Sequence, residues 1–310
     1  VDTKMMNAAA SRAERRASQE SHRLQKFISK PTNECSAGHH SNQPYLLGAV
    51  IGDIVGSRFE RRPHKNPRDF ELIPLHDRRC RFTDDTVLTI AVAYALINGK
   101  PYHESIRYWA NLYPNAGYGK TFRTWMVDET MGPYNSWGNG SAMRVSPCGY
   151  LSTLERVLEE SKASAECTHN HPEGIKGAQA TAACIYLARN GKSKQAIKDF
   201  VCGQFGYNLD RGIEVIRPTY QFDVSCQGSV PESIIAFLEG NNYEETIRFA
   251  VSLGGDSDTQ AAIAGSIAQA FYREDISFEL ESRARQKLVH AQDLMEVVDS
   301  FNQFVTAQNY

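Results

Sequence analysis

Apolar residues recur along most of this chain at the spacing of an α-helix, and no segment alternates apolar and polar residues as a half-buried strand does. In segment 84–98 they occupy nearly all sides of the expected helix, which indicates burial. Segment 213–222 is ambiguous. The pattern predicts an all-α fold, a single compact multi-helix domain larger than a four-helix bundle. The other expected helices are 102–112, 121–126, 151–164, 177–190, 193–205, 231–239, 243–253, 257–272 and 280–303.

Three glycines at four-residue spacing, Gly48, Gly52 and Gly56, lie in an apolar segment that begins at Tyr45. On a helix this spacing leaves one face without side chains, so that another backbone is able to approach closely. Segment 58–81 is polar and interrupted by prolines, which predicts a long loop, and long loops inside compact domains are usually functional.

Two acidic clusters stand at the starts of two expected buried helices. One reads TDDT at 83–86 and the other reads GGDSDT at 254–259. Either cluster alone is typical of a helix N-cap, where acids complement the helix dipole. Together they hold more carboxylates than capping requires, and burying carboxylates without a countercharge is costly. Since oxygen ligands select hard cations, the clusters predict a Mg²⁺, Mn²⁺ or Ca²⁺ site if the fold brings them together.

A further carboxylate, Glu60, stands at the edge of the 58–81 loop, where a ligand would move with the loop. Taken by itself, Glu60 would be a solvated surface acid. With the four aspartates of the two clusters it gives a charge of −5, which two divalent cations at +4 nearly balance. One cation would leave the site strongly anionic, so two are expected. Asp53 is expected to be a structural acid behind the ligands.

A glycine-rich loop occurs at 137–144, with the sequence WGNGSAMR. Small residues expose backbone N–H groups that suit a phosphate, although the segment has neither a GxGxxG nor a P-loop pattern and an ordinary surface turn is the simpler interpretation. The helix-prone residues 141–145 would present a helix N-terminus to an anion. His169 and His171 lack a third nitrogen or sulfur ligand for zinc, so helix capping or substrate contact is expected of them.

Composition adds limits on compartment and partners. Apolar residues make up 41% of the chain, charged residues 23%, and the net charge of −2 gives no general attraction to nucleic acid or anionic membranes. The seven cysteines are scattered and form no CxxC pair, which argues against a disulfide framework. No apolar run suits a membrane span or a secretory signal. We therefore expect a cytoplasmic protein with no nucleic-acid or membrane partner.

Residues 1–44 differ from the rest of the chain. They hold seven Lys or Arg against four Asp or Glu, and few apolar residues. Segment 8–29 is rich in helix formers, and segment 31–44 has the character of a linker. The sequence thus predicts a basic N-terminal extension, 1–44, that is flexible or binds a partner, followed by one helical domain at 45–310.

Six motifs follow one another along the chain: GDIVGSRFE (52–60), FTDDT (82–86), WGNGSAMRV (137–145), THNHPEGIKGA (168–178), CQGSVPESIIAFLE (226–239) and SLGGDSDTQAAIAGSIAQAFY (252–272). In this order they resemble the ADP-ribosylglycohydrolases, the family of the dinitrogenase-reductase-activating glycohydrolase and the vertebrate ADP-ribosylhydrolases. The resemblance covers about residues 45–290. The chain departs from many members after Tyr272, where Arg273-Glu274-Asp275 stands in place of a glycine and a following proline, which affects a local loop past the expected ligands.

This resemblance implies a centre of two Mg²⁺ or Mn²⁺ ions between helix N-termini and an ADP-ribose site beside it. Between the two histidines, His169 matches the family's substrate-contacting histidine better than His171. The implied metal ligands are Glu60, Thr83, Asp84, Asp85, Asp256, Asp258 and Thr259. The implied substrate-binding residues are Gly138, Asn139, Gly140, Ser141, Ala142, Met143, Arg144 and His169.

The implied reaction is hydrolysis of the bond between C1″ of ADP-ribose and a side chain of a modified protein. Glu60 or Asp85 would act as the base toward water. Arginine is the preferred linkage, as in bacterial members of the family, and serine-linked ADP-ribose or a small ADP-ribose ester is the alternative.

Other functions are also open at this stage. Some family members resemble immunity proteins against an ADP-ribosylating toxin, and such a protein would reverse the modification, block the toxin through residues 1–44, or act as a non-catalytic toxin-binding protein. A nucleotide phosphohydrolase is a further alternative, because two-metal carboxylate sites also serve phosphoryl transfer.

Overall fold

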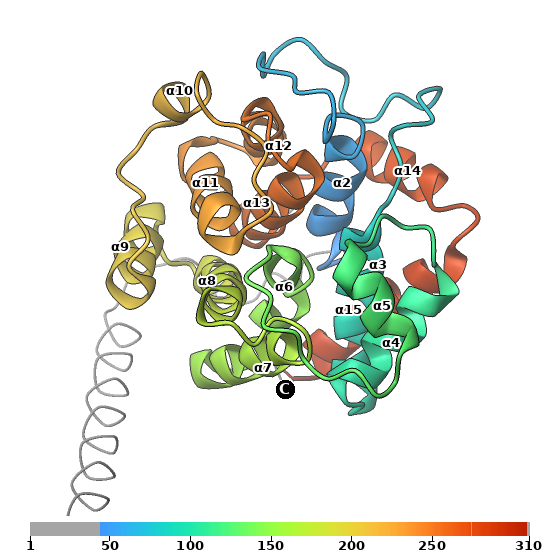
Figure 1. Cartoon of the computed structure of the whole chain (residues 1–310). Coiled ribbons are helices and arrows are strands. Elements are labelled where there is room, and N and C mark those ends of the chain that lie inside the picture. Colours follow the sequence, from blue (N-terminus) through green and yellow to red (C-terminus); the bar gives the residue numbers. More distant parts are fainter. Residues whose placement is uncertain (1–43, 274, 309–310) are drawn as a thin grey trace, which may run out of the picture. The chain divides into compact units, whose positions relative to one another are not determined.

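The computed structural model describes residues 44–273 and 275–308. The regular elements of this part of the chain are helices, and a single isolated bridge joins Gly138 and Ser225. The predicted all-α class is confirmed (Figure 1). The predicted extension lies outside the described residues, apart from Pro44. The helices are α2 (Leu47–Gly56), α3 (Asp84–Asn98), α4 (Tyr102–Leu112), α5 (Lys120–Val127), α6 (Gly140–Met143), η1 (Ser146–Tyr150), α7 (Leu154–Glu166), α8 (Pro172–Arg189), α9 (Lys194–Phe205), α10 (Ile213–Ile216), α11 (Cys226–Glu239), α12 (Tyr243–Ser252), α13 (Ser257–Tyr272), α14 (Phe278–Lys287) and α15 (Gln292–Ala307).

The predicted helix 280–303 is wrong as a single element, because the chain turns between α14 and α15. Leu288 and Ala291 in that turn are both buried. The turn lets α14 pack on α2 while α15 packs on α3, which one straight helix would not do. None of the described helices combines the length and the apolar character needed to cross a membrane.

Two other helices begin earlier than their apolar patterns suggest, because a polar residue caps each of them. The hydroxyl of Ser225 accepts a hydrogen bond from the N–H of Gly228 (3.1 Å), so α11 starts five residues before Pro231. The ring of His171 accepts from the N–H of Glu173 (3.1 Å) at the start of α8, which confirms the capping expected of one of the two histidines.

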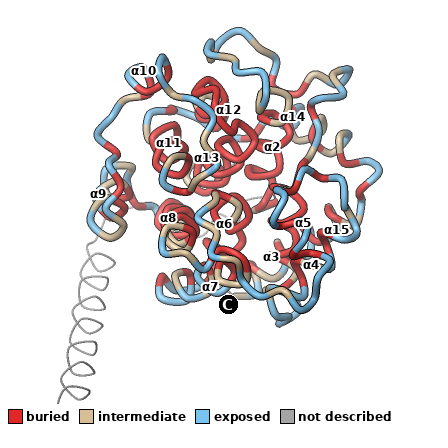
Figure 2. The backbone as a smooth tube through the Cα atoms, in the orientation of Figure 1, coloured by how far each residue is buried: buried red, intermediate tan, exposed pale blue. Residues whose placement is uncertain are grey.

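Helices α2 and α13 lie side by side at the centre of the described chain and are buried along nearly their whole length (Figure 2). The glycines of α2 form the contact. A Cβ at Gly52 would lie 2.1 Å from the carbonyl oxygen of Ala261, and a Cβ at Gly48 would lie 2.5 Å from that of Gly265. The predicted close backbone approach is confirmed. It fixes the antiparallel register that sets the end of α2 beside the start of α13.

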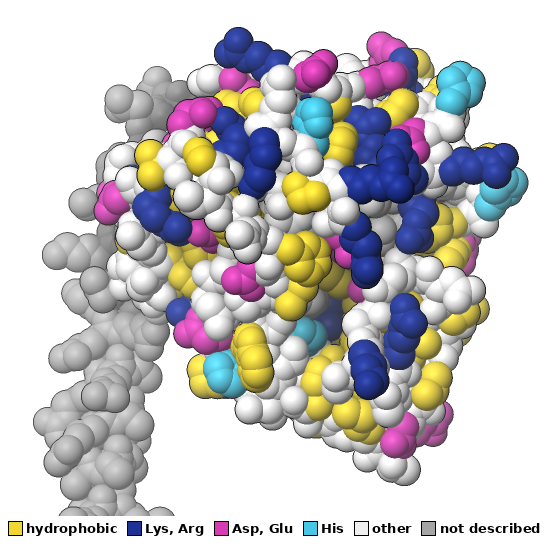
Figure 3. Space-filling view, turned by 45° about the horizontal axis from the view of Figure 1, so that its top comes forward, with side chains coloured by type: hydrophobic (Ala, Val, Ile, Leu, Met, Phe, Trp, Pro, Cys, Tyr) yellow, Lys and Arg dark blue, Asp and Glu magenta, His cyan; other side chains and the backbone are white. Residues whose placement is uncertain are grey.

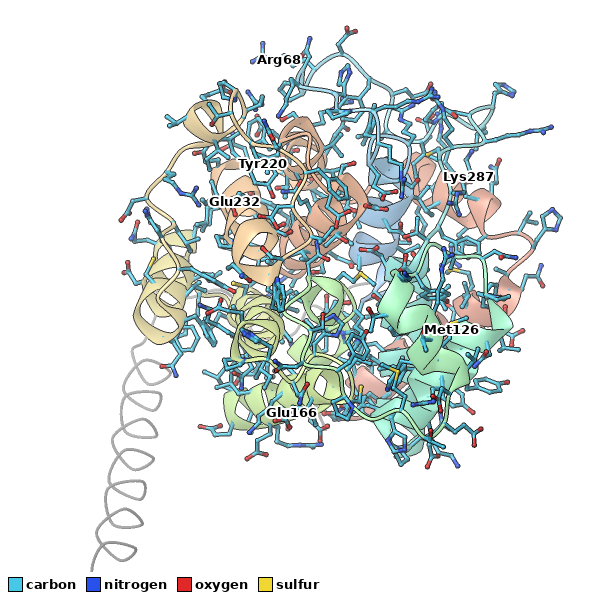
Figure 4. The ribbon with its side chains drawn as sticks, in the orientation of Figure 1. Arg68, Met126, Glu166, Tyr220, Glu232 and Lys287 are labelled. Atoms are coloured by element: carbon cyan, nitrogen blue, oxygen red, sulfur yellow. The ribbon has the colours of Figure 1, made fainter. Side chains whose placement is uncertain are left out.

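The long segment between α2 and α3, residues 57–83, is fastened from outside by cations that donate to its backbone carbonyl groups. Arg248 on α12 donates to Phe70 O (2.7 Å). On α14, Lys287 donates to Leu75 O (3.1 Å) and to Asp77 O (2.9 Å) (Figure 4). The predicted loop is therefore held in place by hydrogen bonds to neighbouring helices. Its two ends carry Glu60 and Thr83.

Candidate metal centre and substrate cleft

The starts of α3 and α13 meet in space, although their acidic clusters are far apart in the sequence. A carboxylate oxygen of Asp85, one of Asp258 and one of Asp53 all lie within 4.8 Å of one another. All three residues are buried. The fold thus brings the two clusters into one acidic group, as the expected metal site requires.

Asp53 on α2 holds the start of α3 in place. Its Oδ2 accepts hydrogen bonds from the N–H of Thr83 (2.8 Å) and the N–H of Thr86 (3.1 Å), two of the groups that a helix start leaves without partners. The hydroxyl of Thr83 donates to Oδ1 (2.7 Å), and that of Thr86 donates to Oδ2 (2.5 Å). Because both oxygens already accept, the structural role expected of Asp53 agrees with its contacts.

Asp85 presents an unused oxygen to the group. Its Oδ2 lies 3.2 Å from the hydroxyl of Thr83, whereas its Oδ1 is buried and has no hydrogen-bond partner in the described part of the chain. A buried carboxylate oxygen without a donor is costly. The surrounding donor set consists of carboxylates and hydroxyls, which suits a hard divalent cation. The residues therefore fit the expected metal ions.

The second cluster is oriented by the glycine-rich loop and by its own turn. Gly254 has φ +71°, a conformation that favours glycine, and the chain there turns into α13. The side-chain N–H of Asn139 donates to Asp256 Oδ2 (2.7 Å) and to the hydroxyl of Ser229 (3.0 Å). Asn139, expected to bind substrate, thus also holds one of the expected metal ligands.

The carboxylates strongly perturb one another. Burial, followed by repulsion from Asp53, raises the pKa of Asp84 to about 8. Burial is also the largest cause that raises the pKa of Asp85 and of Asp258 well above the usual range, with neighbouring carboxylates adding to it. At neutral pH, ionisation of all these carboxylates is unfavourable without positive charge nearby. Divalent cations would supply that charge.

Glu60 differs from the four aspartates because its side chain is 30% exposed. Burial raises its pKa, and the nearby charge of Asp256 raises it further. Its nearest cation is Arg61, at 3.7 Å. Glu60 therefore stands at the edge of the acidic group, in contact with solvent.

The acidic group lines a cleft of about 860 Å³, which is within the range of small-molecule sites. All seven residues expected to bind metal line it. Of the expected substrate-binding residues, Gly138, Asn139, Gly140, Met143, Arg144 and His169 line it as well. Ser141 and Ala142 do not: both are buried in the short helix α6, and the Ser141 hydroxyl donates to Gly174 O (2.7 Å).

His169 turns one ring nitrogen toward the glycine-rich loop. A Cβ at Gly140 would lie 3.1 Å from His169 Nε2. Arg144 Nη2 donates to the hydroxyl oxygen of Thr168 (2.9 Å), which lies 2.7 Å from His169 Nδ1. The Thr168 proton is then directed to Nδ1, so these partners assign the proton of a neutral ring to Nε2. Burial, with Arg144 adding to it, lowers the His169 pKa well below its usual value and keeps the ring neutral.

His171 does not line the cleft. Besides capping α8, its ring lies 5.7 Å from the ring of Trp137, centroid to centroid. The placement of the two histidines therefore agrees with the preference for His169 as the substrate-contacting residue.

Lys65 joins three segments of the chain next to the Gly254 turn, although it does not itself line the cleft. Its ammonium donates to Arg217 O (2.9 Å), to Tyr220 O (2.8 Å) and to Leu253 O. Leu253 directly precedes the Gly254 turn that carries Asp256. This lysine connects the segment of Glu60 with the second acidic cluster, and nothing in its polar, proline-rich surroundings distinguished it in the sequence.

Other residues of the cleft also lacked a sequence signal. Gly117 has φ +128°, and a Cβ there would lie 2.8 Å from Asp84 Oδ1, so its backbone lies against that carboxylate. Tyr118 and Tyr134 line the cleft beside it, as do the half-exposed Phe222 and Val224. Ordinary aromatic residues in loops do not identify themselves as part of a site until the fold places them.

Comparison with known proteins agrees with this geometry. An ADP-ribosylglycohydrolase family model matches residues 43–309. The chain is 26% identical over 311 residues to ADP-ribosylhydrolase ARH3 of Gallus gallus, covering 74% of this chain and 84% of that protein. It is 25% identical over 258 residues to ADP-ribosylarginine hydrolase Tri1 of Pseudomonas putida, covering 73% and 69%.

Among solved structures, an ADP-ribosylglycohydrolase-related protein complex matches with a TM-score of 0.67 and 22% identity, over 84% of this chain and 96% of that chain. That similarity shows the shared fold. The family match extends over all of the described residues. This chain belongs to the ADP-ribosylglycohydrolase family, the glycosidases that remove ADP-ribose from modified targets.

Proposed function

We propose that this protein is a metal-dependent hydrolase that releases ADP-ribose from modified arginine side chains. The observation that carries the proposal is the meeting of Asp85 and Asp258, from two distant clusters, in the wall of one cleft. The arginine linkage is supported by two relatives named ADP-ribosylarginine hydrolase, from Pseudomonas putida and Serratia proteamaculans.

The proposed metal ligands are Glu60, Thr83, Asp84, Asp85, Asp256, Asp258 and Thr259, which all line the cleft. Two bound Mg²⁺ or Mn²⁺ ions would supply positive charge that anchors the ribose hydroxyls and makes a nearby water more acidic. The unused Oδ1 of Asp85 and the raised pKa values of Asp84 and Asp258 support this assignment.

Of the two candidate bases, Glu60 is favoured over Asp85. Glu60 is partly exposed, so water reaches it, and its raised pKa makes its carboxylate a better proton acceptor near neutral pH. It would take a proton from water as the water oxygen bonds to C1″. The bond from C1″ to the guanidine nitrogen breaks, the departing guanidine takes a proton from solvent, and Glu60 returns its own proton to solvent.

The substrate side of the proposal rests on the Gly138–Arg144 loop and His169. The N–H at Nε2 of the neutral ring of His169 would donate to an oxygen of ADP-ribose, because it faces Gly140 in the cleft wall. Arg144 supports this arrangement, because its guanidinium donates a hydrogen bond to Thr168 and the residue is fully buried.

An assay of ADP-ribose release from an arginine-ADP-ribosylated peptide tests the proposal. We expect release with Mg²⁺, loss of release with EDTA, and a drop of about 100-fold or more in Asp84→Ala and in Asp256→Ala, equivalent to about 2.7 kcal/mol of transition-state stabilisation. Asp299→Ala, an exposed acid on α15, is the matched control and should retain full activity. Release that persists in EDTA or in both variants refutes the metal dependence.

The same assay separates the alternatives. A serine-ADP-ribosylated peptide that reacts faster than the arginine peptide overturns the arginine preference. Release of AMP and ribose 5-phosphate in place of intact ADP-ribose overturns glycosidic cleavage in favour of phosphohydrolase chemistry.

A role as an immunity protein against an ADP-ribosylating toxin is a second proposal. It is supported by the basic composition of residues 1–44, which would meet an acidic cleft of the toxin. Removal of residues 1–44 should leave hydrolysis intact and abolish toxin binding. If truncation changes neither property, the blocking role fails, and if hydrolysis is absent while binding persists, the protein is a non-catalytic toxin-binding protein.

A further inference from the structure

Four exposed cations line one side of the cleft mouth, and we call them the basic rim: Arg61, Arg81, Lys120 and Arg123. They come from both ends of the 57–83 segment and from the first turn of α5. In the space-filling view, Lys and Arg side chains gather in a band on this face, beside a group of hydrophobic side chains (Figure 3). The whole chain has a net charge of −2, so this concentration of positive charge is a feature of one face and not of the protein as a whole.

The basic rim lacks the acidic partners that basic residues have elsewhere on the surface. Within the described residues, the one carboxylate at ion-pair distance from it is Glu60, 3.7 Å from Arg61, and Glu60 is an expected metal ligand. Elsewhere, exposed cations are found paired along a helix, as Lys162 is with Glu166 (3.6 Å). Arg81, Lys120 and Arg123 have no carboxylate at ion-pair distance in the described part of the chain, so their positive charge is balanced only in part, by the nearby acidic group.

Two rim residues oppose the local stability of their helix. Lys120 is the first residue of α5, and Arg123 lies in the same first turn, which has no acidic residue. The positive end of the helix dipole disfavours cations there, by about 0.3–1 kcal/mol each. By contrast, α12 and α14 have two acids each in the first turn. A role in stability does not explain Lys120, whereas Arg123 also donates from Nε to Tyr118 O (2.8 Å) and so helps to hold the loop before α5.

The rim stands on the metal-ligand side of the cleft. Arg61 follows Glu60, Arg81 precedes Thr83 by two residues, and α5 begins just after Gly117, whose backbone lies against Asp84. In the proposed function this side holds the ribose that bears the modified side chain, whereas the diphosphate is assigned to the Gly138–Arg144 loop. The rim thus surrounds the place where the target polypeptide leaves the cleft.

We propose that the basic rim docks an acidic polypeptide segment, namely Asp and Glu residues that flank the modified side chain of the target. This inference rests on the proposed function for the placement of ADP-ribose. It commits to a polypeptide because the rim borders the exit of a protein side chain. Complementary charge there would speed association and fix the orientation of the target, in a manner that salt weakens.

Two ADP-ribosylated peptides of equal length test the proposal, one with acidic and one with neutral residues on both sides of the modified arginine. We expect the acidic peptide to bind more tightly and to have a kcat/KM about 10-fold higher at low salt, with the difference mostly lost at about 0.5 M salt. Binding is measured by fluorescence anisotropy and hydrolysis by ADP-ribose release, so that each is read independently.

The variant Lys120→Glu should weaken the preference for the acidic peptide and retain full activity on free ADP-ribosyl-arginine. Lys100→Glu is the matched control, since it makes the same charge change at an exposed residue that does not line the cleft. The control should keep the preference. An equal loss in both variants would trace the effect to net charge and overturn the role of the rim.

The remaining outcomes are also decisive. Tighter binding of the acidic peptide without release from any arginine substrate supports the rim and overturns the proposed arginine hydrolysis. Equal binding and equal, salt-independent hydrolysis of both peptides overturn the rim and leave the proposed function standing. A duplex DNA oligonucleotide that displaces the peptide better than an acidic peptide of the same charge overturns the polypeptide assignment in favour of nucleic acid.

Discussion

Asp53, a buried residue behind the wall of the cleft, serves both the fold and the site. It is fully buried and accepts four hydrogen bonds, two of them from the backbone of the first turn of α3. Burial still raises its pKa to about 6. Its contacts fix Thr83 and orient Asp85 beside Asp258. A residue that touches neither substrate nor solvent therefore determines where the expected ligands stand.

The raised carboxylate pKa values predict that stabilisation by Mg²⁺ grows with pH. Without metal, Asp84 keeps its proton up to about pH 8 in the folded chain but ionises near 3.8 when unfolded. Since the folded state then binds more protons, this group makes the folded state less stable as pH rises from about 4 to about 8. Mg²⁺ competes with those protons, so it should raise Tm more at pH 8 than at pH 6.

Thermal unfolding with Mg²⁺ and with EDTA at the two pH values measures this effect. In Asp84→Asn, which has no ionisable group at that position, the pH dependence of the Mg²⁺ effect should be smaller. An effect of Mg²⁺ on Tm that is equal at both pH values contradicts the assignment of these carboxylates to metal.

At the scale of the elements, the contact of α2 with α13 sets the spacing of the site. Gly52→Ala would place a Cβ 2.1 Å from Ala261 O, so the helices must separate. We expect a loss of about 3 kcal/mol or more in the free energy of unfolding by urea, and weaker Mg²⁺ binding in the protein that remains folded. Gly132→Ala, where a Cβ would meet nothing within 4 Å, is the control and should cost little.

The three hydrogen bonds donated by Lys65 predict a second effect at this scale. Lys65→Met removes the donor to the backbone carbonyls of Arg217, Tyr220 and Leu253 and leaves the aliphatic chain. We expect the Mg²⁺ concentration for half-maximal activity to rise about 10-fold, because Glu60 and the Gly254 turn lose their link. Lys287→Met, which loosens the same segment on the side of α14, should change stability alone. Equal effects of both variants on Mg²⁺ would show that Lys65 is merely structural.

The helices themselves were largely predictable, since periods of apolar residues follow from burial of a helix face. Segment 257–272 coincides with α13, and the glycine spacing of α2 indicated its close contact. The boundaries that differed were set by single polar residues, Ser225 and His171, and by the turn at 288–291. A helical period continues across such a turn, so the pattern alone gave no sign that α14 and α15 are separate.

At the scale of the whole molecule, the site exists because segments far apart in the sequence converge. The TDDT and GGDSDT clusters were visible as unusual, but local pattern carries no information on which helix starts meet. The family resemblance joined them in advance, and the fold does so through Asp53 and the glycines of α2. The positions of Tyr118, Tyr134, Gly117 and Lys65 around the site were not predictable, because their roles depend only on what the fold brings beside them.

One measurement tests the central claim that the two clusters form a single metal-dependent site: a double-mutant cycle of Asp85→Asn and Asp258→Asn in Mg²⁺-dependent ADP-ribose release. Each single variant should lower kcat/KM by about 100-fold, and the double variant should be no more than a few-fold worse than either, because either change disables the same unit. A double variant that shows the full product of the two losses, about 10,000-fold, would mean that the clusters act independently and would contradict the claim.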